Sequence, residues 1–292
     1  RMNKLKRNIV ITGATGFLGS HLIKRLLTQK SCKLTALVRN ATNLPEGCIP
    51  SLCDIRDYES VSETIARSDI VVHLASLVGV SNCDKNHYDS IDINILGTLN
   101  ILDAAMYYEK PVIFSGVANI NDFSIYSITK ATAERFVMMY NKEHKTNFIP
   151  LRIFNVYGPG QDLESGKLII NCIHKGLKGE PINIYGDGNQ IMDFIYIDDV
   201  IAHLEYLIEN INEIENKCYD IGTGIGISIF DLAKKVINMT GNKSEIIFSP
   251  NRSGDKMLEI VANKKKILAN SIPFHQLEDG LSRTIAYIKK TF

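Results

Sequence analysis

The sequence of 292 residues contains no tryptophan and has almost no net charge: 33 Lys and Arg are balanced by 32 Asp and Glu, giving a formal charge of +1. Without a basic excess, the chain lacks the electrostatic footprint of a nucleic-acid-binding protein. No apolar run reaches about 18 residues, and the basic N-terminus leads into a short strand rather than into a signal-peptide core. We therefore expect a cytoplasmic protein that binds neither nucleic acid nor membranes.

Metal-binding and disulfide patterns are also missing. The six cysteines are scattered, with no Cys-x-x-Cys pair and no histidine at the spacing of a zinc site. In a chain of this length, such cysteines indicate reduced thiols in a reducing compartment. We predict neither a metal site nor a disulfide framework.

Short apolar runs alternate with helical periodicity in the first half of the chain. We predict strands at residues 8–12, 33–38, 70–74 and 111–115, helices that begin at Phe17, Tyr58 and Ile125, and a helix near residues 91–108. The run 70–74 is continuously apolar, as strands covered by helices on both faces are. This order predicts an α/β fold with a Rossmann-type doubly wound parallel sheet and a smaller α/β substrate-binding lobe.

The domain boundary is predicted where this regularity weakens. We place a dinucleotide-binding Rossmann domain at residues 1–154 and the substrate lobe at 155–292, with a segment of about 187–222 returning to the Rossmann domain. Glycine and proline clusters follow residue 154, and shorter helices are predicted near 228–239 and 276–290.

A glycine turn joins the first strand to the first helix. Gly13 allows the tight turn, Gly16 permits close approach of the backbone to phosphates, and Gly19 permits close packing of helix and strand. The N–H groups at the start of the following helix then point at the anion. The pattern predicts a binding site for a dinucleotide pyrophosphate.

The residue at the end of the second strand distinguishes NAD from NADP in such folds. An acid there binds the free 2′-hydroxyl of NAD, whereas an arginine binds the 2′-phosphate of NADP. Arg39 occupies this place and favours NADP, although a surface arginine is also ordinary at a strand end. Asp54 is a candidate acceptor for the adenine amino group, with helix capping near Tyr58 as the alternative.

Tyr126 and Lys130 are four residues apart in a predicted helix, so their side chains leave the same face. A phenol with a pKa near 10 is a poor proton-transfer group at neutral pH. A nearby ammonium group stabilises the phenolate, and we expect Lys130 to lower the pKa of Tyr126 toward the working range. Lysine can also bind the ribose hydroxyls of a nicotinamide cofactor.

Several motifs in this order resemble the extended short-chain dehydrogenase/reductase family, in its nucleotide-sugar epimerase, dehydratase and ketoreductase branch (UDP-glucose 4-epimerase-like). The likeness spans almost the whole chain. It includes the turn at 12–19, His73-Leu74-Ala75, Asn94 and the pair Tyr126 and Lys130. In the second lobe it includes residues 151–160, 184–188, 193–200 and 252–255.

The resemblance implies site residues beyond those already named. It implies that Asn155, Tyr185 and Arg252 contact the nucleotide diphosphate sugar. It also implies cofactor contacts from Thr15, Phe17, Leu18, Ile55, Leu74, Ala75, Ser76, Asn94 and Ile153. A planar guanidinium such as that of Arg252 suits a diphosphate.

Two departures from the family pattern stand out. Members carry a Ser or Thr just after the fifth strand, but Gly116 and Val117 occupy those positions here, so either Ser124, which we prefer, or Ser115 replaces the hydroxyl. The shortened segment also lacks the Asp-Glu pair of dehydratases, which disfavours dehydration. The second departure is Met192, where an arginine for the diphosphate is usual. Its loss costs a charged hydrogen bond of about 1.5–3 kcal/mol.

The sequence thus leaves three functions open. The first is an NAD(P)-dependent nucleotide-sugar epimerase that oxidises and reduces C4 transiently. The second is an NADPH-dependent reductase of nucleotide 4-keto sugars, and the third is a catalytically weak cofactor-binding sensor or scaffold. The resemblance also implies a homodimer through the helices near residues 91–108 and 131–140, whose apolar faces alternatively pack on the sheet.

Overall fold

The computed structural model describes residues 7–29, 32–241, 243–250, 259–268 and 272–291. The chain divides into two compact units, of which unit 1 comprises residues 1–152 and 201–219 and unit 2 comprises residues 153–200 and 220–292. The chain therefore leaves unit 1 after residue 152 and returns to it for residues 201–219. This returning segment lies inside the predicted range 187–222.

A seven-stranded sheet with the order β10-β6-β5-β4-β1-β2-β3 organises unit 1. The pairs of β1 with β2 and β4, of β2 with β3 and of β4 with β5 are parallel. The strands are β1 (Arg7–Thr12), β2 (Cys32–Val38), β3 (Cys48–Leu52), β4 (Ile70–His73), β5 (Val112–Val117), β6 (Phe148–Ile153) and β10 (Tyr219–Ile221). The apolar run predicted to be central is β4, which is buried along its whole length. The predicted Rossmann-type fold is confirmed.

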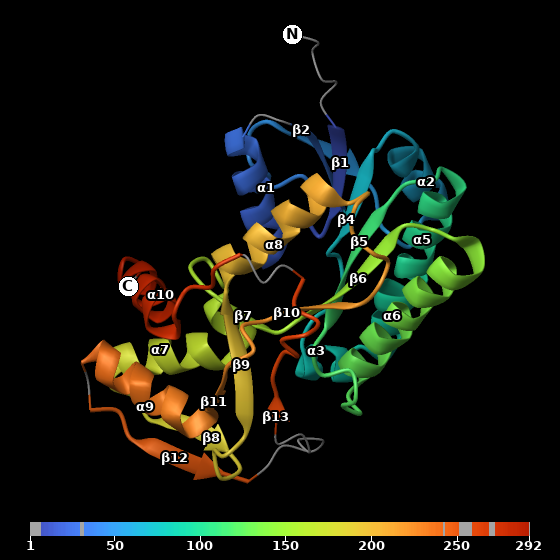
Figure 1. Cartoon of the computed structure of the whole chain (residues 1–292). Coiled ribbons are helices and arrows are strands. Elements are labelled where there is room, and N and C mark those ends of the chain that lie inside the picture. Colours follow the sequence, from blue (N-terminus) through green and yellow to red (C-terminus); the bar gives the residue numbers. More distant parts are fainter. Residues whose placement is uncertain (1–6, 30–31, 242, 251–258, 269–271, 292) are drawn as a thin grey trace. The chain divides into compact units, whose positions relative to one another are not determined.

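Helices cover both faces of this sheet. Figure 1 shows α1 (Phe17–Gln29) and α8 (Ile197–Asn210) on one face, and α2 (Tyr58–Ala66), α5 (Gly97–Tyr107) and α6 (Ile125–His144) on the other. Val10, Val71 and Phe114 of the sheet pack with α5 and α6 residues such as Ile101 and Val137 in one buried cluster. The first residues of α1, α2 and α6 agree with the predicted helix starts.

Unit 1 also contains elements that the sequence pattern did not reveal. The edge strand β3 contains Pro50, which is tolerated at a sheet edge. The short helices α3 (Val80–Lys85) and α4 (His87–Ile91) precede a π-helical turn, η1 (Asp92–Leu96), so the predicted helix near 91–108 is not one regular helix. Such π turns are frequently found at functional sites.

Among its described residues, unit 2 combines two small sheets with the helices α7 (Leu168–Lys178), α9 (Ile229–Thr240) and α10 (Leu277–Lys289), and a 3₁₀ turn, η2 (Leu163–Ser165). β9 (Ile191–Tyr196) pairs in parallel with β7 (Asn155–Tyr157) and β13 (Glu259–Ile260), and antiparallel with β11 (Gly226–Ser228). β8 (Ile182–Tyr185) and β12 (Ile246–Ser249) form the second sheet. The predicted helices near 228–239 and 276–290 correspond to α9 and α10.

Asp193 connects three segments of unit 2. Its fully buried carboxylate accepts hydrogen bonds from Thr223 N and Oγ1 (3.1 and 2.6 Å), Gly224 N (2.8 Å) and Ala262 N (3.2 Å). A buried carboxylate is tolerated when such donors replace water. Asp193 therefore anchors β9 to the segments around residues 223 and 262.

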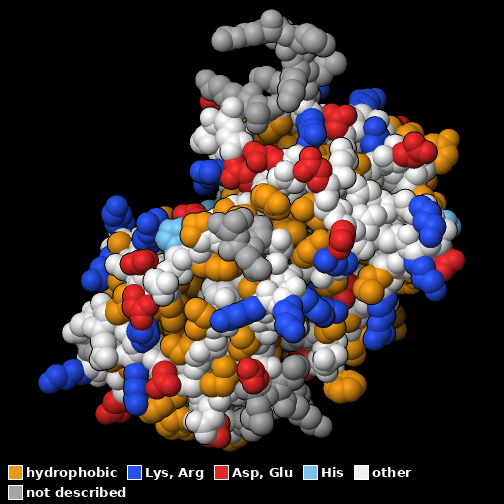
Figure 2. Space-filling model, in the orientation of Figure 1, with side chains coloured by type: hydrophobic (Ala, Val, Ile, Leu, Met, Phe, Trp, Pro, Cys, Tyr) orange, Lys and Arg blue, Asp and Glu red, His pale blue; other side chains and the backbone are white. Residues whose placement is uncertain are grey.

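The surface carries no bias toward one charge on the face in view. Figure 2 shows both Lys and Arg and Asp and Glu side chains on that face. Within the described ranges, no helix has the length and apolar character needed to traverse a bilayer. None of the six cysteines, all of which lie within those ranges, forms a disulfide.

Candidate cofactor and catalytic site

The turn between β1 and α1 has the close contacts that its glycines predict. Gly13 has a positive φ of 66°, and a Cβ added to it would lie 2.7 Å from Ala75 N and 2.8 Å from the carbonyl carbon of Leu74. A Cβ on Gly19 would lie 2.3 Å from the carbonyl oxygen of Gly13. Gly13 and Gly19 therefore let the turn pack against the loop after β4 and against the start of α1. Thr15 and Gly16 are exposed, whereas Phe17 and Leu18 are half-buried.

A chain of buried hydrogen bonds fixes the turn to the loop after β4. Thr12 Oγ1 accepts from the backbone N–H groups of Leu74 (3.1 Å) and Ala75 (3.0 Å), and it contacts His73 Nδ1 at 2.7 Å. His73 Nε2 contacts Thr98 Oγ1 at 3.0 Å, and this hydroxyl donates to Asn94 O.

These contacts define the proton positions on His73. The Thr98 hydroxyl donates its proton to Asn94 O, so His73 Nε2 must be the donor to Thr98 Oγ1. His73 Nδ1 then carries no proton and accepts from Thr12 Oγ1. Burial, with a smaller contribution from the charge of Lys130, lowers the pKa of His73 to about 3. The ring is therefore neutral at physiological pH.

Asn94 joins the loop after β4 to α6 from the π-helical turn. Its side-chain oxygen accepts from Leu77 N (2.7 Å), and its amide donates to Leu77 O (3.1 Å) and Thr129 Oγ1 (3.0 Å). Thr129 Oγ1 in turn donates to Tyr126 O at 3.0 Å. Both amide hydrogens of Asn94 are thus used within the protein, so a cofactor contact would have to come from its remaining acceptor capacity.

Tyr126 and Lys130 lie one turn apart in α6, as predicted. The Lys130 ammonium lies 4.6 Å from the centroid of the Phe114 ring of β5, which is in register with His73 and Thr12, the last residues of β4 and β1, and the Lys130 side chain is almost fully buried. The carboxyl ends of the strands are where ligands bind in open α/β sheets. The helix therefore brings both side chains to the edge of the sheet that also carries Gly13.

The pKa values of the pair differ from the simple expectation. Burial lowers the pKa of Lys130 to about 7, although the charge of Glu134 raises it. Burial raises the pKa of Tyr126, and the Cys83 thiolate would raise it further. The expectation that Lys130 lowers the pKa of Tyr126 is therefore wrong for the protein alone, because removal of the phenol from water raises this pKa.

The two candidate serines lie in different surroundings. Ser124 is the N-cap of α6, where its hydroxyl accepts from Ser127 N (3.2 Å) and donates to Ser127 Oγ (3.1 Å). Ser115 is buried in β5. Because side chains alternate along a strand, it lies on the opposite face from Phe114, away from Lys130. The structure thus brings Ser124, but not Ser115, to the helix that carries Tyr126.

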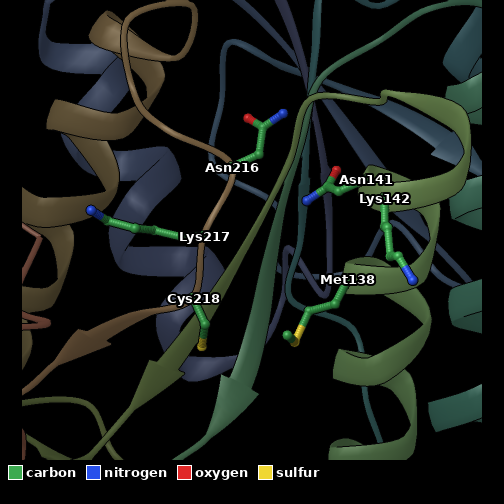
Figure 3. A pocket seen from close by; sticks show the side chains of 6 residues that line it. All are labelled: Met138, Asn141, Lys142, Asn216, Lys217 and Cys218. Atoms are coloured by element: carbon green, nitrogen blue, oxygen red, sulfur yellow. The ribbon is translucent and has the colours of Figure 1, made fainter.

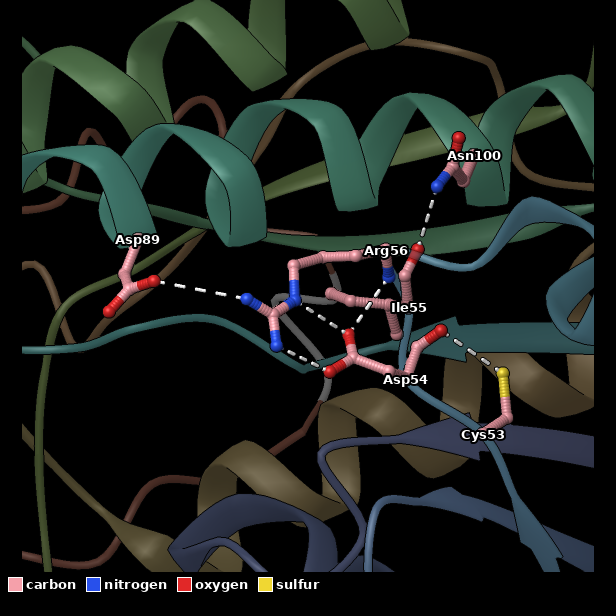
Figure 4. Close-up of polar contacts among 6 residues, drawn as sticks. All are labelled: Cys53, Asp54, Ile55, Arg56, Asp89 and Asn100. Atoms are coloured by element: carbon pink, nitrogen blue, oxygen red, sulfur yellow. Dashed lines mark hydrogen bonds and ion pairs between the residues drawn. The ribbon is translucent and has the colours of Figure 1, made fainter.

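Arg39 and Asp54 follow neighbouring strands. Arg39 is exposed after β2, whereas Asp54 accepts hydrogen bonds from Arg56 Nε (3.0 Å) and Nη2 (2.7 Å), as Figure 4 shows. The Arg56 hydrogen bonds lower the pKa of Asp54, with a smaller contribution from Arg39. The alternative capping role of Asp54 is wrong, because Asp57 is the N-cap of α2. Asn100 holds the loop by donating to Ile55 O at 2.9 Å.

The substrate residues implied for unit 2 are less tightly defined. Asn155 in β7 is half-buried and donates to Asp193 O at 3.0 Å, whereas Tyr185 ends β8 and is exposed. Ile153 is buried. Met192 lies in β9 between Ile227 and Ile260. The predicted diphosphate contact Arg252 lies outside the described residues.

Comparison with known proteins agrees with this geometry. The profile of the NAD dependent epimerase/dehydratase family matches residues 9–222. The chain belongs to this family. A putative UDP-glucose 4-epimerase from Methanocaldococcus jannaschii is 30% identical, covering 96% of this chain and 98% of its own. This chain is thus an enzyme of the nucleotide-sugar epimerase/dehydratase class.

Solved structures show the same fold as this family member. A UDP-glucose 4-epimerase from Thermus thermophilus, in complex with NAD, is 25% identical with a TM-score of 0.87, and covers 98% of this chain and 100% of its own. A UDP-glucuronic acid 4-epimerase from Bacillus cereus, with UDP-glucuronic acid and NAD, is 26% identical with a TM-score of 0.87, at the same coverage. UDP-glucuronic acid decarboxylases and a dTDP-D-glucose 4,6-dehydratase are also relatives.

A pocket of about 330 Å³ in unit 1 contains none of the predicted site residues (Figure 3). Its polar side chains already have partners: Asn141 binds the backbone of Phe148, Lys142 lies 3.6 Å from Glu143, and Lys217 lies 2.7 Å from Glu215. The other lining residues are Met138, Asn216 and Cys218. We assign no ligand to this pocket.

Sequence reasoning missed the supporting residues of the site. Thr12, His73, Thr98 and Thr129 hold the turn, the loop after β4 and α6 in place, but none was predicted to do so. One signal was available, because His73 ends an otherwise apolar buried strand. A polar side chain at such a place requires a partner.

Proposed function

We propose that this family member is an NAD-dependent sugar-nucleotide 4-epimerase that acts on a UDP-hexose. The observation that carries the proposal is the position of Tyr126 and Lys130, one turn apart on α6, beside the strand ends that carry the glycine turn. The likeness to two solved UDP-sugar 4-epimerases over 98% of this chain supports the reaction and the nucleotide.

The residues present fit a nicotinamide dinucleotide. Gly13 leaves no room for a Cβ against Leu74 and Ala75, so the turn keeps the tight form that a pyrophosphate needs. Unpaired N–H groups in the first turn of α1 would bind the phosphates. The adenosine end would lie near Arg39 and Asp54, and Lys130 would bind the nicotinamide ribose.

The chain itself contributes proton transfer and charge. When bound, an oxidised nicotinamide supplies a hydride acceptor and a positive charge. Tyr126 would take the proton from the sugar 4-hydroxyl as C4 is oxidised, and would return that proton to the C4 oxygen when the ketone is reduced from its other face. The charged form of Lys130 would stabilise the phenolate of Tyr126, opposing the effect of burial on its pKa.

Turnover of UDP-glucose to UDP-galactose without added cofactor tests the proposal, with the two sugars quantified by proton NMR. Tyr126→Phe is expected to reduce the rate by about 10²- to 10⁴-fold, because it removes the proton-transfer group. Tyr140→Phe is the matched control, since Tyr140 lies on the same helix but donates its hydroxyl to Asp103. Equal rates for the wild type and the Tyr126 variant would refute the proposal.

A 4-keto-sugar reductase remains the second candidate because Arg39 is exposed at the end of β2, where a 2′-phosphate would bind. This function predicts strict dependence on added NADPH and no turnover of UDP-hexoses. Supplying a UDP-uronic acid in the same experiment separates epimerisation from decarboxylation, since only the latter releases carbon dioxide.

We also propose a homodimer through α5 and α6. One face of α6 packs on the sheet through Ala133 and Val137, but Met138 and Met139 are exposed, as is Tyr107 of α5. Apolar side chains exposed on neighbouring helices are typical of an interface. Light scattering is expected to give twice the chain mass, and Met139→Glu is expected to give a monomer. A monomeric wild type would refute this part.

A further inference from the structure

Glu134 follows Lys130 by one turn of α6 and is a buried carboxylate with a fixed partner. It is 3% exposed, and Arg152 of β6 donates to it through Nε (3.0 Å) and Nη2 (2.6 Å). A Cβ added to Gly116 of β5 would lie 3.4 Å from Glu134 Oε2, so the carboxylate lies against the end of that strand. The Glu134–Arg152 pair therefore connects α6 with β6 and lies against β5, one helical turn from Lys130.

Lys130 needs such support because its surroundings are apolar or neutral. Its ammonium lies over the Phe114 ring, and the nearby His73 is uncharged at physiological pH. Cys83 of α3 affects Tyr126, and burial raises the pKa of that thiol, so it adds no negative charge at neutral pH. Among the described groups that act on the charge of Lys130, Glu134 is the one that favours it.

We propose that Glu134, fixed by Arg152, is a positioning residue that keeps Lys130 charged inside the protein. Its catalytic importance rests on the proposed function, in which the Lys130 ammonium assists Tyr126. Residues 126, 130 and 134 then form one stripe on α6, in which phenol, ammonium and carboxylate follow each other at intervals of four residues.

The direction of the effect follows from the charges. Burial disfavours the ammonium, and the negative charge of Glu134 offsets part of this penalty. The neutral amide in Glu134→Gln removes the offset while keeping an acceptor for Arg152. The titration midpoint of Lys130 is then expected to fall by about one pH unit. At pH values above the midpoint, this lowers the charged fraction of Lys130 about tenfold.

The titration of Lys130 is measured by NMR on protein labelled at lysine Cε, with the Lys130 signal assigned by its absence from Lys130→Arg. We expect Glu134→Gln to lower the midpoint, and Glu134→Asp, which keeps the charge, to remain close to the wild type. Glu205→Gln is the matched control, because Glu205 is another buried carboxylate ion-paired with an arginine, Arg25. The control is expected to leave the Lys130 midpoint unchanged.

Activity supplies the second readout. In Glu134→Gln, turnover of UDP-hexose is expected to fall more at pH 8 than at pH 6, whereas a purely structural role lowers both equally. If Glu134→Gln does not fold, the double variant with Arg152→Gln, which leaves no unpaired buried charge, is expected to lower the midpoint as well. An unchanged Lys130 midpoint overturns the inference. Absent turnover in the wild type overturns only the proposed function, since the NMR titration requires no substrate.

Discussion

Replacing Gly13 by alanine is expected to damage the glycine turn through two separate effects. Gly13 has a φ of 66°, and the left-handed conformation costs a residue with a Cβ about 1–2 kcal/mol. The new Cβ would also lie 2.7 Å from Ala75 N and 2.8 Å from the Leu74 carbonyl carbon. Both are backbone atoms, so the loop after β4 has to move, and such overpacking costs about 1–3 kcal/mol. The sum is about 2–5 kcal/mol in the free energy of unfolding.

Gly166 provides a control for the conformational part. Its φ is also 66°, but no atom lies within 4 Å of an added Cβ. Gly166→Ala is therefore expected to cost only the conformational term of about 1–2 kcal/mol. Because the chain lacks tryptophan, urea unfolding is followed by far-UV circular dichroism, and the transition of the unit that carries the substitution is compared with that of the wild type.

Dinucleotide affinity distinguishes the turn from a general loss of stability. Gly13→Ala displaces the segment that would contact the pyrophosphate, so its Kd for NAD, measured by calorimetry, is expected to rise at least about tenfold, or 1.4 kcal/mol. Gly166→Ala is expected to bind as the wild type does. Equal losses of stability in the two variants, together with an unchanged Kd for Gly13→Ala, would refute the reasoning.

Three further changes probe the supporting contacts. The folded pKa of His73 is about 3 against 6.5 when unfolded, so its contribution to stability is present above pH 6.5 and is lost as the pH falls toward 3, by about 1.4 kcal/mol per pH unit. His73→Gln is expected to flatten this slope in urea titrations, and an unchanged slope would contradict the assignment. Asp193→Asn replaces one carboxylate oxygen by an NH₂ group, so two of the four hydrogen bonds lose their acceptor, and it is expected to destabilise unit 2 by about 2–4 kcal/mol in urea. A loss below that of an exposed substitution such as Asp187→Asn would contradict the anchoring role. Asn94→Ala is expected to accelerate hydrogen exchange at Leu77 N, which loses its acceptor; unchanged protection there would argue against the link from the π-helical turn.

The sequence predicted the elements whose signals are local. The apolar run at 70–74 and the turn from Gly13 to Gly19 depend on neighbouring residues, and both were placed correctly. β3 was missed because Pro50 and its exposed positions do not give the pattern of a buried strand. The π-helical turn was missed because it depends on contacts of Asn94 with Leu77 and Thr129, which are distant in sequence.

The same distinction applies to the site. The spacing of Tyr126 and Lys130 predicted that both side chains leave the same face of the helix. It did not predict their burial, which raises the pKa of Tyr126 and lowers that of Lys130. The pairing of Glu134 with Arg152 joins residues 18 positions apart, and in sequence either charge reads as an ordinary surface group. Such partners become visible only once α6 is packed against the sheet.

The discontinuous path of the chain bears on how the protein is made. The segment 201–219 supplies Glu205 for Arg25, the carbonyl of Ile208 for Arg7 and that of Ile211 for Asn147. During synthesis, unit 1 therefore cannot complete its contacts until about three-quarters of the chain has left the ribosome, and neither unit can be obtained by a single cut. A fragment ending at residue 152 is expected to expose apolar surface and aggregate, whereas a fragment that joins 1–152 to 201–219 by a short linker is the one suited to independent folding.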